Sequence, residues 1–101
     1  MTPPESEPRI ATMEISEFEA KIKELQNKIA YKQTQIEEIE EILNDQEYMD
    51  EHDKNKLSFD KIVELEDEKG IFKDKKKALE DEVISTQKEK HNVLKRNTLL
   101  N

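Results

Sequence analysis

The side chains that could do chemistry in this 101-residue chain are two histidines, many carboxylates and a run of lysines. His52 and His91 are the only histidines and lie far apart, and there is no cysteine, so neither a nucleophile–base set nor a zinc-type ligand set can be assembled. General acid–base work needs a carboxyl held in a dehydrated pocket, which a rod of helices does not provide. The sequence therefore predicts a protein that is not an enzyme, with no catalytic residue, cofactor or metal site.

The segment from Asp50 to Asp53, which includes His52, carries oxygen ligands, so cation binding is one interpretation. A calcium loop needs a central glycine for its sharp turn and a terminal bidentate glutamate. This segment has no glycine, so a solvated turn is the favoured interpretation. The lysines at 73 and 75–77 similarly allow a phosphate site, but the favoured interpretation is that they offset the acidic stretch at 37–41.

The composition predicts long helices rather than a compact core. Only 33% of residues are hydrophobic and 42% are charged, with one glycine and no proline after Pro8. The net charge of −8 disfavours binding to nucleic acid or to an anionic membrane surface. No apolar run is long enough for membrane insertion, and residues 1–9 do not resemble a signal peptide. A cytoplasmic location is therefore expected.

In the first half, apolar residues recur every three or four positions, like positions a and d of a heptad. With Ile15 as position a and Lys32 at one d position, the series is Ile15, Phe18, Ile22, Leu25, Ile29, Ile36, Ile39 and Leu43. Ser16 and Glu19 have the spacing of a capping box, which predicts a first helix at about 16–51. Residues 1–12 are expected to form a disordered or loosely packed arm.

The heptad pattern breaks in the middle of the chain, where Gln46, Asp50 and Asp53 occupy the a and d positions. A second series then begins, with Ile62 as position a: Ile62, Leu65, Phe72, Leu79, Val83 and Val93. Its register is displaced by five residues from the first, which is neither a stutter nor a stammer. Because Ser58 suits an N-cap, the second helix is predicted at about 58–97.

Two helical segments of nearly equal length predict an all-α fold, in which residues 13–101 form an antiparallel coiled-coil hairpin. Folding the chain about residue 54 aligns five layers that are apolar on both sides. The same alignment brings Lys21 towards Glu89. It also sets Lys32 opposite Lys76, so both side chains must extend outward.

A parallel homodimer is the alternative arrangement. It would place Lys69, Lys76 and Lys90 against their own copies, which the hairpin avoids. The hairpin is therefore favoured, and with it a monomer over a homodimer. The hairpin further predicts that Glu40 approaches Lys73.

Apolar residues outside the seam are the candidate partner-binding residues. Val63 and Gly70 fall at heptad position b and Ile71 at position c, on the outside of the second helix, where Gly70 would let another chain approach closely. Tyr48 and Met49, with Asp50, form a second candidate contact near the turn. The candidate partner-binding residues are therefore Tyr48, Met49, Asp50, Val63, Gly70 and Ile71.

Four short stretches also carry a resemblance to a known family: Pro3-Pro4-Glu5, Lys21-Ile22-Lys23-Glu24-Leu25, Met49-Asp50 and Ser58-Phe59-Asp60. Through them the chain resembles the HR1-type domains of Rho-family GTPase effectors, and most of all those of F-BAR adaptor proteins. The resemblance implies a monomeric antiparallel hairpin that binds a Rho-family small GTPase.

The sequence thus favours a non-catalytic protein-interaction module, with a Rho-family GTPase as the specific partner hypothesis. The alternative is a parallel homodimeric coiled coil that serves as a spacer or dimerisation element of a larger assembly.

Overall fold

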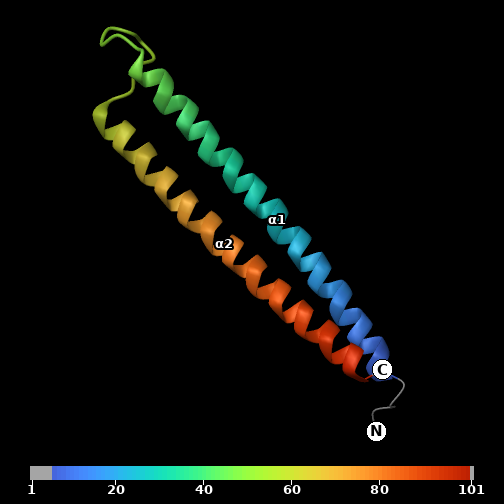
Figure 1. Cartoon of the computed structure of the whole chain (residues 1–101). Helices are drawn as coiled ribbons and strands as arrows, with labels where there is room; N and C mark the ends of the chain where they lie inside the picture. The colour runs from blue at the N-terminus through green and yellow to red at the C-terminus, as the bar shows by residue number, and fades with distance from the viewer. Residues whose placement is uncertain (1–5, 101) are drawn as a thin grey trace. The chain divides into compact units, whose positions relative to one another are not determined.

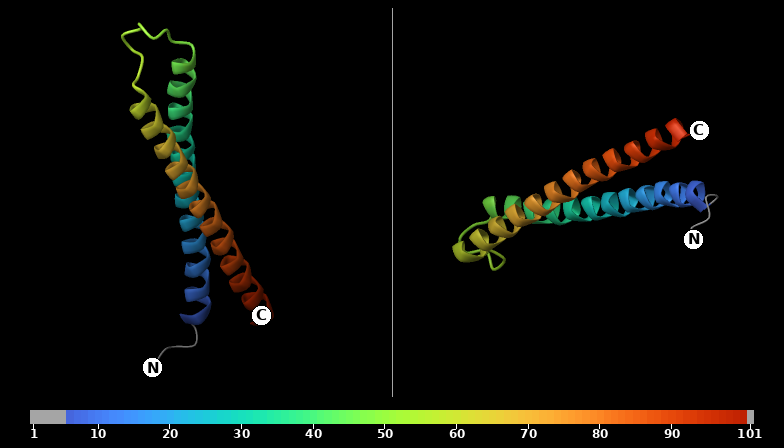
Figure 2. Two further views of the ribbon diagram at one scale, coloured as in Figure 1. Left: turned by 90° about the vertical axis from the view of Figure 1, so that its left-hand side faces the viewer. Right: turned by 90° about the horizontal axis from the view of Figure 1, so that it is seen from below.

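The computed structural model describes the backbone of residues 6–100 and the side chains of residues 15–98. It contains two α-helices, α1 (Ser6–Glu47) and α2 (Phe59–Leu100), joined by residues 48–58. The joining segment reverses the chain direction (Figure 1), and the two views of Figure 2 show the same reversal. The predicted all-α helical hairpin is confirmed.

The hairpin divides into two compact units, each with part of both helices. Of the described residues, the terminal unit comprises 6–27 and 79–100. The loop unit comprises Lys28–Ala78 and so contains the connection between the helices.

The predicted heptad positions form the buried seam of each unit. In α2, every residue from 59 to 98 that is not exposed occupies position a or d. In α1, every a and d residue from Ile15 to Gln46 is buried or half-buried. Among the described side chains, the most deeply buried apolar ones are Leu25 and Val93 in the terminal unit and Ile36 and Ile39 in the loop unit.

The start of α1 differs from the prediction. The helix begins at Ser6 rather than at residue 16, so Ser16 and Glu19 lie inside it and do not cap it. Pro8 falls in the first turn, where proline is tolerated because its missing N–H would have no intrahelical partner. Of the arm predicted at 1–12, residues 1–5 lie outside the described residues and the remainder belongs to α1.

The end of α1 also differs, because the helix stops at Glu47 rather than at residue 51. The next residues form turns in which aspartate side chains accept backbone N–H groups. Asp50 Oδ1 accepts the N–H of His52 at 3.5 Å, and Asp53 Oδ1 accepts the N–H of Asn55 at 2.8 Å. Such turns offer the backbone an alternative to helical hydrogen bonds, so the helix ends early.

The start of α2 agrees with the prediction. Ser58 Oγ accepts the N–H of Lys61 at 3.2 Å, so Ser58 is the N-cap. Asp60 lies in the first turn, where its negative charge interacts favourably with the helix dipole. The helix extends to Leu100 rather than ending at residue 97. Within the described residues, neither helix holds an apolar stretch long enough to cross a membrane.

Candidate functional site at the loop end of the hairpin

The connection between the helices is organised by Gln46, whose side chain is only 5% exposed. Its Nε2 donates to the carbonyl of Asn55 at 3.2 Å, and its Oε1 accepts the N–H of Leu57 at 2.7 Å. Its backbone carbonyl accepts a hydrogen bond from Lys56 Nζ at 2.6 Å. Gln46 therefore closes the seam at a d position and also holds the returning chain in place.

The sequence pattern identified Gln46 only as an interruption of the seam. An amide at a core position has two donors and an acceptor oxygen to satisfy, so it needs polar partners nearby. The sequence offered one indication of this role: Gln46 occupies the last d position before the turn-forming residues Asp50 and Asp53. That signal could not show which backbone groups of the turn would meet the amide.

The predicted tip residues separate into exposed and structural ones. Tyr48 is 88% exposed, and Asp50 is also exposed. Met49 is half-buried, with its Sδ 3.3 Å from Gln46 Nε2. Tyr48 and Asp50 are thus available to a partner, whereas Met49 contributes to the packing of the loop.

Phe59 is an exposed aromatic residue that the sequence analysis did not include in the site. Its side chain is 78% exposed and lies at the first residue of α2, so Tyr48 and Phe59 flank the same loop. Val63 follows one turn later on the same side of α2 and is also exposed. We call Tyr48, Asp50, Phe59 and Val63 the loop-end surface. The signal for Phe59 was an apolar residue placed directly after the N-cap and off the seam.

The other two predicted partner-binding residues lie farther along α2. Gly70 is exposed, and a Cβ at this position would meet no atom within 4 Å. Val63 and Gly70 share position b, whereas Ile71 is about 100° further round the helix at position c. Ile71 is 52% exposed. Because position c borders g and position b borders e, the predicted stripe is split between two flanks of the hairpin.

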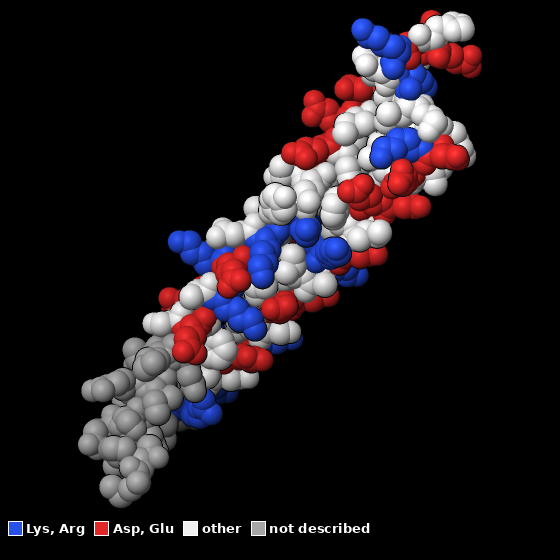
Figure 3. All heavy atoms as spheres, turned by 180° about the vertical axis from the view of Figure 1, so that it is seen from behind, with Lys and Arg blue, Asp and Glu red and all other residues white. Residues whose placement is uncertain are grey.

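Charge is distributed very unevenly around the loop. Residues 37–68 contain 14 aspartates and glutamates but three lysines, a net charge of −11 with His52 neutral. The whole chain carries −8, so its remaining residues together carry +3. On the face shown in Figure 3, acidic side chains are prominent near the loop end, and basic ones gather further along the helices. Tyr48, Phe59 and Val63 of the loop-end surface therefore lie in a strongly acidic setting.

Lys32 and Lys76, which were predicted to lie opposite each other, extend their side chains in different directions. Lys32 Nζ donates to Gln35 Oε1 at 2.9 Å and lies 5.1 Å from the centre of the Phe72 ring. Lys76 Nζ donates to Gln33 Oε1 at 2.7 Å. Both ammonium groups therefore have partners, and their half-buried stems complete the seam of the loop unit.

The basic run does not neutralise the neighbouring acidic stretch by direct pairing. Lys73, Lys75 and Lys77 are exposed, and within the described residues none of them forms an ion pair. The predicted contact between Glu40 and Lys73 is accordingly not formed. Fixing a long exposed side chain in one ion pair gains little free energy, because the side chain loses conformational entropy. These lysines therefore stay solvated.

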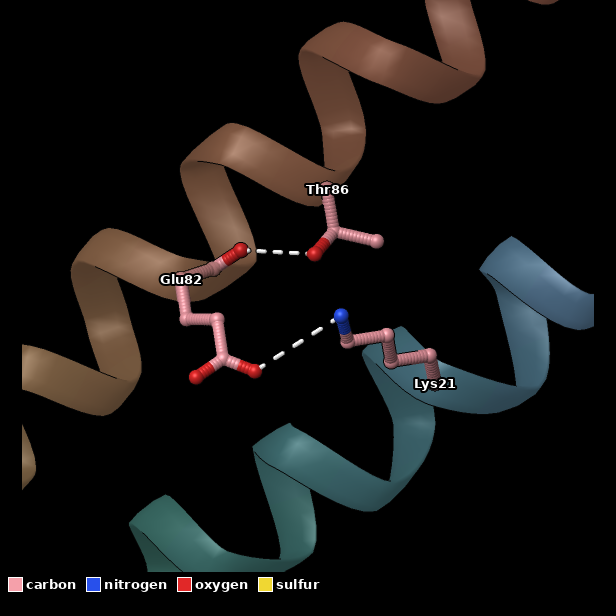
Figure 4. A network of polar contacts seen from close by, with 3 residues as sticks. All are labelled: Lys21, Glu82 and Thr86. Atoms are coloured by element: carbon pink, nitrogen blue, oxygen red, sulfur yellow. Dashed lines mark hydrogen bonds and ion pairs between the residues drawn. The ribbon is translucent and has the colours of Figure 1, made fainter.

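Ion pairs do link the two helices of the terminal unit. Lys21 Nζ lies 3.8 Å from Glu82 Oε2, and Lys90 Nζ lies 3.5 Å from Glu19 Oε1. Figure 4 shows the first pair beside Thr86, whose hydroxyl donates to the backbone carbonyl of Glu82 at 2.7 Å. The predicted partner of Lys21 was Glu89, one heptad further along. The lysine instead meets the glutamate at the preceding g position.

Among the described residues, no group of three or more histidines, aspartates or glutamates is arranged to hold a metal ion. His52 and His91 are both exposed. Every buried side-chain nitrogen or oxygen in the described part of the chain has a hydrogen-bond partner. The polar features of the hairpin are therefore satisfied within the structure, apart from those that face solvent.

The sequence matches no protein-family model and no curated protein, and the structure matches no solved structure.

Proposed function

We propose that this chain is a non-catalytic, cytoplasmic protein-interaction module that binds a protein partner through its loop-end surface. The observation that carries the proposal is the exposure of Tyr48 and Phe59 on either side of one loop. Aromatic side chains of this kind are enriched among the residues that supply most of the energy of protein interfaces.

The loop is suited to binding because its backbone is already fixed. The hydrogen bonds from Gln46 to Asn55 and Leu57 hold the segment between the two aromatic residues. Binding at a fixed loop costs less conformational entropy than binding at one that must first become ordered.

The charge around the loop selects the kind of partner. A net charge of −11 over residues 37–68 favours a partner with a basic surface around an apolar pocket. The first specific candidate is a Rho-family small GTPase, which the resemblance to HR1-type domains suggests. The loop-end surface is small, so we expect an affinity on the order of micromolar.

The test is a titration of the isotope-labelled chain with a Rho-family GTPase, once loaded with a GTP analogue and once with GDP. The proposal predicts nucleotide-dependent amide shifts at Tyr48, Phe59 and Val63. Phe59→Ala should weaken binding about tenfold, because an aromatic anchor typically contributes more than 1 kcal/mol. Raising the salt concentration should also weaken binding, because it screens the charge attraction.

Ile84→Ala is the matched control, because Ile84 is an exposed apolar residue of α2 in the terminal unit. This variant should bind as the parent chain does. If no amide shifts at high micromolar GTPase while helicity is intact, the GTPase proposal fails.

The second candidate function is a homodimeric coiled-coil spacer or dimerisation element. In its parallel form it would need the a and d residues that the hairpin uses within one chain, among them Ile36 and Ile39. Double electron–electron resonance between single cysteine labels at Tyr48 of two chains separates the two arrangements. A parallel coil would hold the labels close together in every dimer, whereas intact hairpins would give no short intermolecular distance.

A further inference from the structure

One flank of the loop unit carries exposed apolar residues from both helices. Tyr31 and Ile42 of α1 occupy positions c and g, and Ile71 of α2 occupies position c; all three are exposed. In an antiparallel pair of helices the g positions of both helices lie on the same side of the seam. We call this side the c/g flank.

The contacts of the lysine layer support this placement. Lys32 lies 5.5 Å from the centre of the Tyr31 ring and 5.1 Å from that of Phe72, so its amine emerges among residues of both helices. It also donates to Gln35 at position g. Lys76 leaves towards Gln33, which is at position e on the other side.

Along α1, the c/g flank is complementary to its own reversed copy. If a second α1 runs antiparallel about a point between residues 36 and 37, Tyr31 faces Ile42 of the copy, and an apolar contact forms. In the same alignment Gln35 faces Glu38, and Lys28 faces Asp45. Each of these contacts occurs twice because of the symmetry.

Along α2, the same flank is also complementary to its reversed copy. Reversal about a point between residues 71 and 72 sets Glu68 opposite Lys75 of the copy, and Ile71 lies next to its own counterpart. Glu68 and Lys75 are exposed, and neither forms a hydrogen bond or ion pair in the described part of the chain. They are therefore available to each other across an interface.

The two reversal points lie within about one residue of each other in the hairpin. The hydrogen bond between Lys76 and Gln33 sets these residues side by side across the seam. Counting inward from that contact places residues 36 and 37 of α1 beside residues 73 and 72 of α2, which is one residue from the reversal point between residues 71 and 72. A single two-fold axis can therefore satisfy the contacts of both helices.

We propose that two copies of this chain associate through their c/g flanks, antiparallel, around a two-fold axis next to Ile71. Both hairpins stay intact, so this dimer differs from the parallel coil that would replace them. The acidic loop end of each copy lies against the basic part of the other, which favours this direction over the one with both loops together.

The size of the flank indicates a weak dimer. The aligned stretch from residue 28 to residue 45 is about 26 Å long at ~1.5 Å per residue, and two helices span about 20 Å. The pair would bury on the order of 1,000 Å² in total, which is at the lower end of the buried areas found for specific protein–protein interfaces. We therefore expect the mass to change with concentration in the micromolar range.

Sedimentation equilibrium of the whole chain over a concentration series tests the proposal. The mass should rise from 12.0 kDa towards twice that value, and high salt should shift the rise to higher concentration. Ile71→Asp should abolish the dimer. The matched control is Ile84→Asp, because Ile84 is 51% exposed against 52% for Ile71 and lies in the terminal unit.

Charge reversal tests the alignment itself. Glu68→Lys and Lys75→Glu should each weaken the dimer at least tenfold, and the double variant should restore it. Circular dichroism of every variant should show unchanged helicity, because the altered side chains are exposed. A constant mass of 12.0 kDa up to millimolar concentration at low salt overturns the proposal. It is equally overturned by a dimer that Ile71→Asp does not affect, or by a double variant that stays monomeric.

Discussion

Among the described side chains, the loop unit and the terminal unit each bury one polar side chain in the seam, but they satisfy its hydrogen bonds differently. In the terminal unit, Thr86 donates to the carbonyl of Glu82, four residues earlier in its own helix. In the loop unit, Gln46 bonds to Asn55 and Leu57, nine and eleven residues away across the turn. A hydrogen bond within one helix does not constrain the tertiary structure, whereas hydrogen bonds across the turn fix the path of the chain.

The largest effect is expected from the core of the loop unit. Ile36→Ala removes most of a side chain that is among the least exposed in the described residues, and it should destabilise the hairpin by about 2–4 kcal/mol. Urea unfolding followed by circular dichroism measures the change. Lys77→Ala, at an exposed position of the same unit, should have a far smaller effect. Equal effects would mean that the seam is not the core.

A second experiment compares the two buried polar residues directly. Gln46→Ala leaves the N–H of Leu57 and the carbonyl of Asn55 without their partner, so it should cost about 1–3 kcal/mol. Thr86→Val keeps the side-chain shape and removes only a local hydrogen bond, so stability should change by less than about 0.5 kcal/mol. Thermal unfolding of both variants ranks them, and the opposite ranking would break the comparison.

Hydrogen exchange sharpens the same comparison. The amide of Leu57 should exchange slowly in the parent chain and quickly in Gln46→Ala, because its acceptor is removed. Thr86→Val should leave this amide as protected as before. Fast exchange of Leu57 in the parent chain would show that Gln46 does not hold the loop.

A smaller, stabilising effect is expected at Gly70. The glycine lies inside α2, and an added Cβ would meet no atom within 4 Å. Gly70→Ala should therefore stabilise the hairpin by about 0.5–1 kcal/mol through its better helix propensity. Chemical denaturation measures the change. A loss of stability would indicate that the helix does not tolerate a side chain there.

The smallest effect is expected from the ion pairs of the terminal unit. Lys21 and Glu82 are both about half exposed, and their charges are 3.8 Å apart. A double-mutant cycle with Lys21→Met and Glu82→Gln should give a coupling of about 0.2–1 kcal/mol that decreases with salt. A coupling as large as the effect of Gln46→Ala would reverse the relative importance of the two units.

The sequence predicted the seam well because heptad spacing depends only on which residues avoid water. Every predicted position from Ile15 to Leu43 and from Ile62 to Val93 is buried or half-buried. The five-residue displacement correctly placed the break. The helix boundaries were predicted less well, because the capping-box spacing of Ser16 and Glu19 indicated a start at residue 16, whereas the first helix begins at Ser6.

The candidate site was predicted only in part, since its exposure depends on how the loop folds. Tyr48 and Asp50 are exposed as expected, whereas Met49 packs against Gln46. Nothing in the spacing of the residues could show that Gln46 would reach Leu57 across the turn. Phe59 was missed because heptad analysis discards apolar residues that fall outside positions a and d.

The short connection at 48–58 also affects the competition between the hairpin and any coil formed from separate chains. Because the connection joins the two seams covalently, each helix experiences its partner at an effective concentration on the order of millimolar. Separate chains at micromolar concentration are about a thousandfold more dilute than this effective concentration. A parallel coil would therefore have to gain in its contacts what it loses by opening the loop, while the pairing of two closed hairpins incurs no such loss.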